Sequence, residues 1–314
     1  MQFPITKLIP VAFALLLCGC ATSHETQFRL AEAIRTEIYH QTEAQFDNGT
    51  FLKPREAAGT ETAFKLAPLV VQEIHPTTKT NQSAPASSTP STNDALMNFT
   101  RSEASIHGRT YQQWTYFWRS SAWNRSARGH QNPVDPEQFT SSRHRKSQKS
   151  NSGPLPIQGI RITLNKAGNP VIWEVLSDTS GAEIIFVAQS VEAAGASQFG
   201  PPLPGRRHST EIESTNAPLA VVARVIEDGP TPIGPMVYSR AGTRNISAVL
   251  CRCMPSQVKQ LVRVRYYRLV DSKPQRLESF IEKNGKSKQW KNIMPTDWFD
   301  PNRLERKLRL PAEF

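Results

Sequence analysis

The chain has 314 residues, of which 38 are Lys or Arg and 27 are Asp or Glu, so its formal net charge is +11. Hydrophobic residues make up 38%. Beyond the N-terminus no apolar run approaches the roughly 18 residues of a membrane-spanning helix, which excludes a polytopic membrane protein. The sequence also contains no phosphate loop, zinc-finger spacing or hydrolase elbow. At roughly 150 residues per domain, the length allows one or two domains.

Residues 1–19 have the layout of a signal peptide. Lys7 precedes the apolar run Leu8–Leu17, which is too short to span a bilayer as an anchor. The run ends in Leu17-Cys18-Gly19-Cys20, and this sequence resembles the lipobox of bacterial lipoproteins. The resemblance implies cleavage before Cys20 and attachment of a diacylglycerol, with palmitate-type chains, to its thiol. An ordinary secretory signal with a chance cysteine is the alternative.

The lipobox resemblance also implies a location in the cell envelope. The residue after Cys20 is Ala21 and not the Asp that often retains such proteins in the inner membrane. We therefore expect a membrane-anchored lipoprotein on the periplasmic face of the outer membrane. Several acyl chains would hold it firmly, because each buried methylene contributes about 0.8 kcal/mol.

The next two segments differ in composition. Residues 20–74 are expected to hold the lipidated N-terminus and an amphipathic helix, because apolar residues recur there at helical spacing. These residues are Phe28, Ala31, Ile34 and Ile38. Residues 75–95 are rich in Ser, Thr, Pro and Asn, and they are expected to form a flexible, disordered linker.

Residues 96–150 form an aromatic and basic segment. Were this segment helical, one face would carry Tyr111, Trp114, Thr115 and Trp118. Aromatic planes next to arginines suit stacking on sugars, nucleobases or lipid headgroups. Packing of these aromatic side chains against a sheet is the other interpretation, and we favour it.

Residues 151–270 are expected to be a β-rich core. Alternating and β-branched residues predict strands, with a hairpin between the first two. The predicted strands are Ile160–Leu164, Val171–Leu176, Glu183–Ala188, Ala220–Ile226 and Val262–Val270. Residues 271–314 form a basic C-terminal segment that is expected to pack on the sheet through Trp290, Trp298 and Phe299. The expected fold class is α+β, with a mainly antiparallel sheet, the N-terminal helix and the linker.

Two cysteines remain as thiols once Cys18 is cleaved off and Cys20 is lipidated. Cys251 and Cys253 would lie in an oxidising compartment. On a regular strand their Cα atoms would be about 6.5–7 Å apart, at the upper edge of disulfide geometry. A structural disulfide or two buried thiols is the main interpretation. The alternatives are a redox-active pair and a Cu(I) site that adds Met254.

Basic residues on the predicted strands suggest a binding surface. Arg161, Arg263 and Arg265 alternate with apolar residues, so the sheet can present a basic stripe, which Arg206 and Arg207 would extend. An ordinary solvated sheet face is the alternative, and the pattern alone favours it. A basic stripe would suit anionic lipid headgroups, lipopolysaccharide or an acidic envelope protein, whereas nucleic acid is not expected outside the cytoplasm.

The sequence therefore favours a lipid-anchored, non-catalytic binding or assembly module. A thiol-redox or copper-handling protein that uses Cys251 and Cys253 is the alternative, and a hydrolase acting on envelope polymers comes third. No zinc site and no cofactor are expected, because none of the seven histidines is paired at ligand spacing.

Overall fold

The structure is a computed structural model in which strands predominate. Strands take up 51% and helices 20% of the residues that it describes, so the expected α+β class is wrong and the fold is mostly β. The described residues are 25–36, 46–55, 61–74, 95–119, 157–176, 182–213, 219–229, 233–240, 246–250, 258–273, 277 and 297–314. The residues of the expected signal peptide, almost the whole expected linker and the Cys251/Cys253 segment lie outside these ranges.

Eleven strands occur in the described part of the chain. They are β1 (Phe46–Pro54), β2 (Leu69–Glu73), β3 (Ala95–Ile106), β4 (Arg109–Arg119), β5 (Ile157–Leu164), β6 (Pro170–Val175), β7 (Glu183–Ala188), β8 (Ala220–Ile226), β9 (Met236–Ser239), β10 (Ile246–Leu250) and β11 (Val258–Asp271). The longer helices there are α2 (Glu61–Leu66), α4 (Gln189–Phe199), α7 (Arg303–Lys307) and a helix at residues 25–36.

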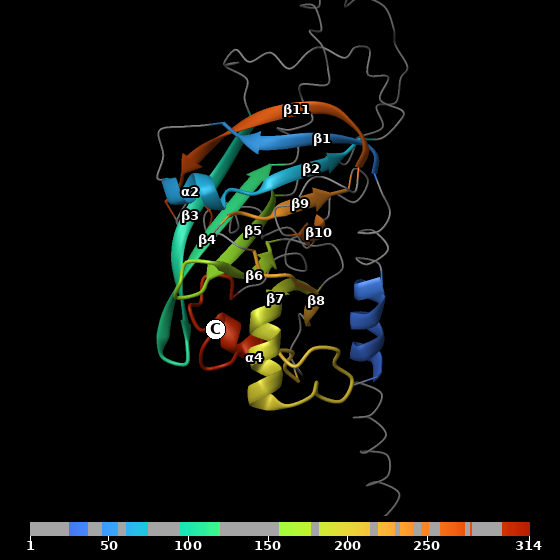
Figure 1. The fold of residues 1–314 in the computed structure, drawn as a ribbon, viewed down its shortest axis with the longest axis vertical. Coiled ribbons are helices and arrows are strands. Elements are labelled where there is room, and N and C mark those ends of the chain that lie inside the picture. The colour runs from blue at the N-terminus through green and yellow to red at the C-terminus, as the bar shows by residue number, and fades with distance from the viewer. Residues whose placement is uncertain are drawn as a thin grey trace, which may run out of the picture.

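These strands join one mixed sheet (Figure 1). Its order is β10-β9-β2-β1-β11-β3-β4-β5-β6-β7-β8. Of the ten pairs of neighbouring described strands, six are antiparallel, and the four parallel pairs are β1–β11, β11–β3, β2–β9 and β7–β8. A mainly antiparallel sheet was expected because the predicted strands have hairpin spacing and few helices between them, so that strands that follow one another in sequence would lie next to each other. β11 departs from this tendency, since it comes late in the chain and lies between β1 and β3, parallel to both.

All five strands predicted within residues 151–270 are present, as β5, β6, β7, β8 and β11. The predicted hairpin is confirmed, because β5 and β6 pair in antiparallel fashion. In the turn of this hairpin, the side-chain oxygen of Asn165 accepts hydrogen bonds from the backbone N–H groups of Ala167 and Asn169, at 3.0 and 2.9 Å. Gly168 adopts a φ of 82°, which glycine accommodates without strain.

The aromatic segment at residues 109–119 is strand β4 and not a helix. Trp114, Tyr116 and Trp118 alternate along it, and each is at most 2% exposed. The intervening residues Thr115 and Phe117 are buried as well. Because both faces of β4 are covered, its sequence lacks the alternation of apolar and polar residues that marks a half-exposed strand.

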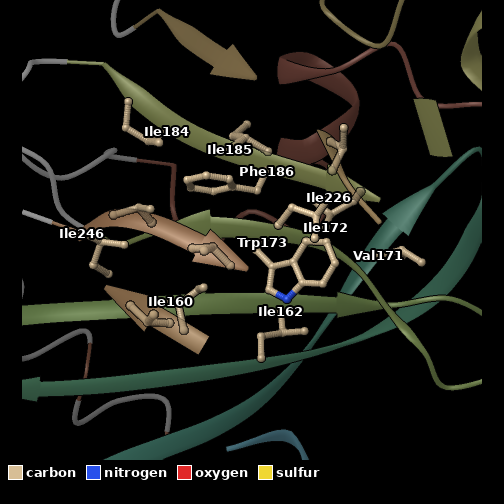
Figure 2. Packing of buried hydrophobic residues seen from close by; sticks show 14 of the residues in the cluster. Ile160, Ile162, Val171, Ile172, Trp173, Ile184, Ile185, Phe186, Ile226 and Ile246 are labelled. Carbon is tan, nitrogen blue, oxygen red and sulfur yellow. The ribbon is translucent and has the colours of Figure 1, made fainter. Parts of the chain in front are cut away.

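The sheet curves so that strands far apart in its order share one core. Val237 of β9 and Ile246 of β10 belong to the same buried cluster as Ile160 of β5 and Phe186 of β7. Figure 2 shows Ile246, Ile160 and Trp173 within this interior. Each large aliphatic side chain buried there contributes about 1.5–3 kcal/mol, so the shared core stabilises the curvature.

Distant segments pack on other parts of the sheet. Trp298 is 2% exposed and lies in a second cluster with Phe117 and Leu176, which confirms its expected packing on the sheet. Phe299 is 42% exposed, and Trp290 lies outside the described residues. A helix is present at residues 25–36, within the region 20–74 where an amphipathic helix was expected, and strand β1 begins in the same region at Phe46.

Candidate functional site

Arg161 lies in the interior, which corrects the expectation that it belongs to an exposed stripe. Its side chain on β5 is 4% exposed. Its Nε and Nη2 atoms donate to both carboxylate oxygens of Glu174 on β6, at 2.6 and 2.7 Å, and its Nη1 donates to the carbonyl oxygen of Trp298 at 2.5 Å. The guanidinium carbon also lies 4.0 Å from the centre of the Trp298 ring. Residues 297–314 cover this part of the sheet and remove Arg161 from water.

Arg303 of α7 extends this pair into a larger ion cluster. It donates to Glu174, to Glu183 at 2.6 Å and to Asp297 at 3.1 Å. The Nζ atom of Lys307 lies 3.2 Å from Glu183. We call the group of six the C-terminal ion cluster, and its members are Arg161, Arg303, Lys307, Glu174, Glu183 and Asp297. Three cations balance three carboxylates in it.

The two most buried carboxylates of the cluster have opposite pKa shifts. Burial alone would raise the pKa of Glu174, but the charges and hydrogen bonds of Arg161 and Arg303 outweigh it and hold the pKa below 4.5. Burial raises the pKa of Glu183 above 4.5, because the nearby charges of Arg303 and Lys307 compensate only in part. The cations and carboxylates of the cluster thus pair mainly with one another, and these pairs hold the C-terminal segment on the sheet.

Strand β11 is the most basic strand, with three Arg, one Lys and one Asp. Arg263 and Arg265 lie on the same face of it as Tyr267, whose ring is fully buried, because side chains two residues apart share a face. Both arginines are half-buried. Burial and, after it, the positive charge of Arg263 lower the pKa of Arg265. The structure thus brings these two predicted residues together, at the inner side of the strand.

The opposite face of β11 carries a second set of cations. Tyr266 and Arg268 lie there, and they are approached by Lys53 of the neighbouring strand β1 and by Arg55, which follows the end of β1. The Lys53 Nζ atom and the Arg55 guanidinium carbon lie 5.0 and 5.1 Å from the centre of the Tyr266 ring. The apolar side chains Val264 and Leu96 are 36% and 43% exposed on the same face. We call this group of six the basic patch, and its members are Lys53, Arg55, Leu96, Val264, Tyr266 and Arg268.

Sequence reasoning missed most of the basic patch. Arg268 follows the predicted Arg263 and Arg265 within one strand, so it could have been predicted as a binding residue from the same pattern. Lys53 and Arg55 lie more than 200 residues away, in a region where only a helix was expected. Their approach depends on the parallel pairing of β1 with β11, for which the local sequence contains no signal.

Arg206 and Arg207 lie away from β11 and do not extend its stripe. Arg206 donates to Gln27 at 3.5 Å, and Arg207 lies 4.0 Å from Glu32, so both contact the 25–36 helix. A groove of about 370 Å³ separates that helix from the loop, and its lining includes Phe28, Leu203 and Arg206. The five predicted arginines therefore occupy three places in the structure.

The cysteine-centred hypotheses concern residues that the structure does not describe. Cys20, Cys251, Cys253 and Met254 lie outside the described ranges. Within those ranges, no three His, Cys, Asp or Glu side chains gather closely enough to hold a metal ion. None of the helices described is both long enough and apolar enough to cross a membrane.

Comparisons with protein-family models, with curated proteins and with solved structures found no match to this chain. Argument about its function therefore starts from the two groups of charges just described. The charges of the C-terminal ion cluster pair mainly with one another in the interior. The basic patch presents cations, an aromatic ring and apolar side chains at the surface, and such a surface can hold an anionic partner by charge attraction and flat contact.

Proposed function

We propose that this protein is a lipid-anchored protein of the cell envelope that acts as a non-catalytic binding or assembly module. In this proposal the basic patch holds an anionic partner. The observation that carries it is the arrangement of Lys53, Tyr266 and Arg268 on one accessible face of β1 and β11, with exposed Val264 beside them. Arg263 and Arg265 lie on the other face of the same strand and add to the positive potential there.

The anchoring half of the proposal is supported by Leu17-Cys18-Gly19-Cys20. Mass spectrometry of the N-terminal peptide from the membrane fraction tests it. We expect a chain that begins at Cys20 and carries acyl groups, and a Cys20→Ser variant that carries none. An unmodified N-terminal peptide in the wild-type protein would contradict the anchor.

The binding half is tested with the full lipidated chain, held in nanodiscs of phosphatidylcholine. Vesicles that contain phosphatidylglycerol, and separately lipopolysaccharide, serve as anionic probes. A basic residue near an anionic lipid surface contributes about 1 kcal/mol, so the double variant Lys53→Gln/Arg268→Gln should bind phosphatidylglycerol vesicles about thirty-fold more weakly. Wild-type binding should also fall steeply as the salt concentration is raised from about 0.1 M to about 0.5 M, because the Debye length then shortens from about 10 Å to about 4 Å.

The matched control is Arg224→Gln/Lys166→Gln. It removes two exposed cations that lie outside the basic patch, on β8 and in the β5–β6 turn. We expect near-wild-type binding from this control. Equal losses in the two double variants, or binding that is insensitive to salt, would overturn the proposal that the basic patch is the binding site.

A further inference from the structure

The 25–36 helix has a fixed place on the body of the protein. Its Arg35 side chain is 2% exposed. The Nε atom of Arg35 donates to the carbonyl oxygen of Val222 on β8 at 3.1 Å, and its Nη2 donates to the buried carboxylate of Glu211. Ala31 and Ile34 are buried beside it. A buried ion pair of this kind holds the helix in one orientation, because release would leave Glu211 without its cation.

The beginning of this helix marks where an anchored membrane has to be. Cys20 precedes Glu25 by five residues, and five residues span about 17 Å at most, whatever path they follow. Glu25 and Phe28 line the groove with Leu203 and Arg206. An acylated Cys20 therefore holds the membrane close to this end of the helix.

The basic patch lies at the other end of the molecule. In Figure 1 the longest axis is vertical, with β11 at the top and the 25–36 helix, drawn in blue, near the bottom together with α4. A compact chain of this length measures about 50 Å across. The Debye length at physiological salt is about 8 Å, so charges at one end act weakly on a surface at the other.

We infer that the basic patch faces away from the membrane that holds the lipid anchor, and that its partner is an acidic surface of another protein. The inference rests on the proposed function and narrows it, because it removes the headgroups of the anchoring membrane from the possible partners. It also assigns the groove end, with Phe28 at 39% and Leu30 at 42% exposed, to the membrane side.

The composition of the patch favours a protein partner. Tyrosine and arginine are enriched at protein interfaces, where aromatic rings and guanidinium groups contribute much of the binding free energy. Lys53 and Arg55 lie 5.0 and 5.1 Å from the centre of the Tyr266 ring, and the exposed apolar side chains Val264 and Leu96 belong to the same face of the sheet. Complementary carboxylates on the partner would steer its approach and set its register.

The test uses the full lipidated protein in nanodiscs and the acetylation rate of the Lys53 amine. One set of discs contains phosphatidylcholine alone, and the other contains phosphatidylglycerol as well. We expect equal Lys53 rates in the two sets. Poly-L-glutamate, the probe for an acidic protein surface, should slow Lys53 acetylation several-fold in both, and Arg268→Gln should weaken its binding whereas Arg224→Gln should not.

The outcomes separate this inference from the function on which it rests. Slower Lys53 acetylation in phosphatidylglycerol discs would mean that the basic patch contacts the membrane that holds the lipid anchor. This result would overturn the inference, but the proposed function, in which the basic patch binds an anionic partner, would stand. Protection by added phosphatidylglycerol vesicles but not by poly-L-glutamate would overturn the protein partner alone. Protection by neither probe would overturn the proposed function as well.

Discussion

Strands β5 and β11 carry arginines in similar sequence surroundings but expose them to opposite environments. Arg161 of β5 lies opposite Glu174 of β6, and a distant segment brings Trp298 and Arg303 over the pair. Arg268 of β11 lies opposite Leu96 of β3 and is exposed. The cross-strand neighbour and the covering segment, and not the strand's own sequence, decide whether an arginine stabilises the fold or is available to a partner.

The energetic consequences of the two arrangements differ as well. Buried charges are costly unless each is paired, so the C-terminal ion cluster depends on every one of its members. Exposed cations keep their hydration and contribute little to folding, and their attraction for anions is available for binding. Substitutions in the cluster should therefore change stability, and substitutions in the basic patch should change binding.

The largest effect is expected for Arg303→Ala. The substitution leaves Glu174 and Glu183 buried with fewer cations, and breaking a buried pair in this way costs about 3–5 kcal/mol. The free energy of unfolding of the full chain, measured in urea, tests it. Arg306→Ala removes an exposed arginine of the same helix that pairs with Asp297 and Asp300, and it should cost far less. Similar losses in both variants would mean that the cluster does not hold the C-terminal segment.

The next largest effect on the free energy of unfolding is expected for Glu174 and Glu183, the two carboxylates whose pKa values shift in opposite directions. Glu174→Gln should cost about 2–3 kcal/mol at neutral pH, because it removes hydrogen bonds from buried guanidinium groups. The folded pKa of Glu174 lies below its unfolded value of 4.5, so its stabilisation is present above pH 4.5 and is lost as the pH falls through the folded pKa. The advantage of the wild type over Glu174→Gln should shrink under acid.

Glu183→Gln should show the opposite slope. The folded pKa of Glu183 lies above 4.5, so its contribution is fully present below pH 4.5 and declines as the pH rises through the folded pKa. Relative to Glu183→Gln, the wild type should therefore gain stability under acid. Urea unfolding at a series of pH values measures both slopes, and slopes of the same sign would contradict the assignment of the two environments.

The fold was predictable from sequence where the local pattern of residues is typical of a strand. Residues 160–188 alternate or run apolar between clear turns, so β5, β6 and β7 and their hairpin follow from the pattern. β4 was not recognised as a strand, because both of its faces are buried and Trp114, Thr115 and Phe117 show no alternation of polarity. The position of β11 between β1 and β3 depends on pairing between segments that lie far apart in the sequence, which no local pattern encodes.

The candidate site was predictable only in part, for the same reason. Arg263 and Arg265 were identified from their alternation with valines. Arg161 shows the same alternation but is buried by residues 297–314, whose path over β5 and β6 could not be foreseen from the sequence. Lys53 becomes part of the basic patch only through the pairing of β1 with β11.

Arg35, like Arg161, is buried and paired with a carboxylate. Substituting it tests whether the 25–36 helix is held as firmly as the C-terminal segment. Arg35→Ala should cost about 2 kcal/mol, because buried Glu211 loses a charged hydrogen-bond donor. The effect should be local, with faster hydrogen exchange in residues 25–36 and at Val222 of β8. Arg29→Ala is the control, since Arg29 is exposed and pairs only with exposed Glu25 among the contacts of the described helix. Unchanged exchange in Arg35→Ala would mean that the helix is held by its apolar contacts.

The smallest change in stability is expected where β11 is made to resemble β5. Leu96→Glu places a carboxylate opposite Arg268, as Glu174 lies opposite Arg161. A cross-strand ion pair on an exposed face contributes about 0.2–1 kcal/mol, so the free energy of unfolding should change little. Binding of phosphatidylglycerol vesicles should nevertheless weaken about five-fold, because the new charge offsets the cation of Arg268. Leu96→Gln removes the same apolar side chain without adding charge and should retain most of the binding. If Leu96→Glu bound the vesicles as tightly as Leu96→Gln, the anionic partner would contact another part of the surface, and the contrast between the two strands would be one of burial alone.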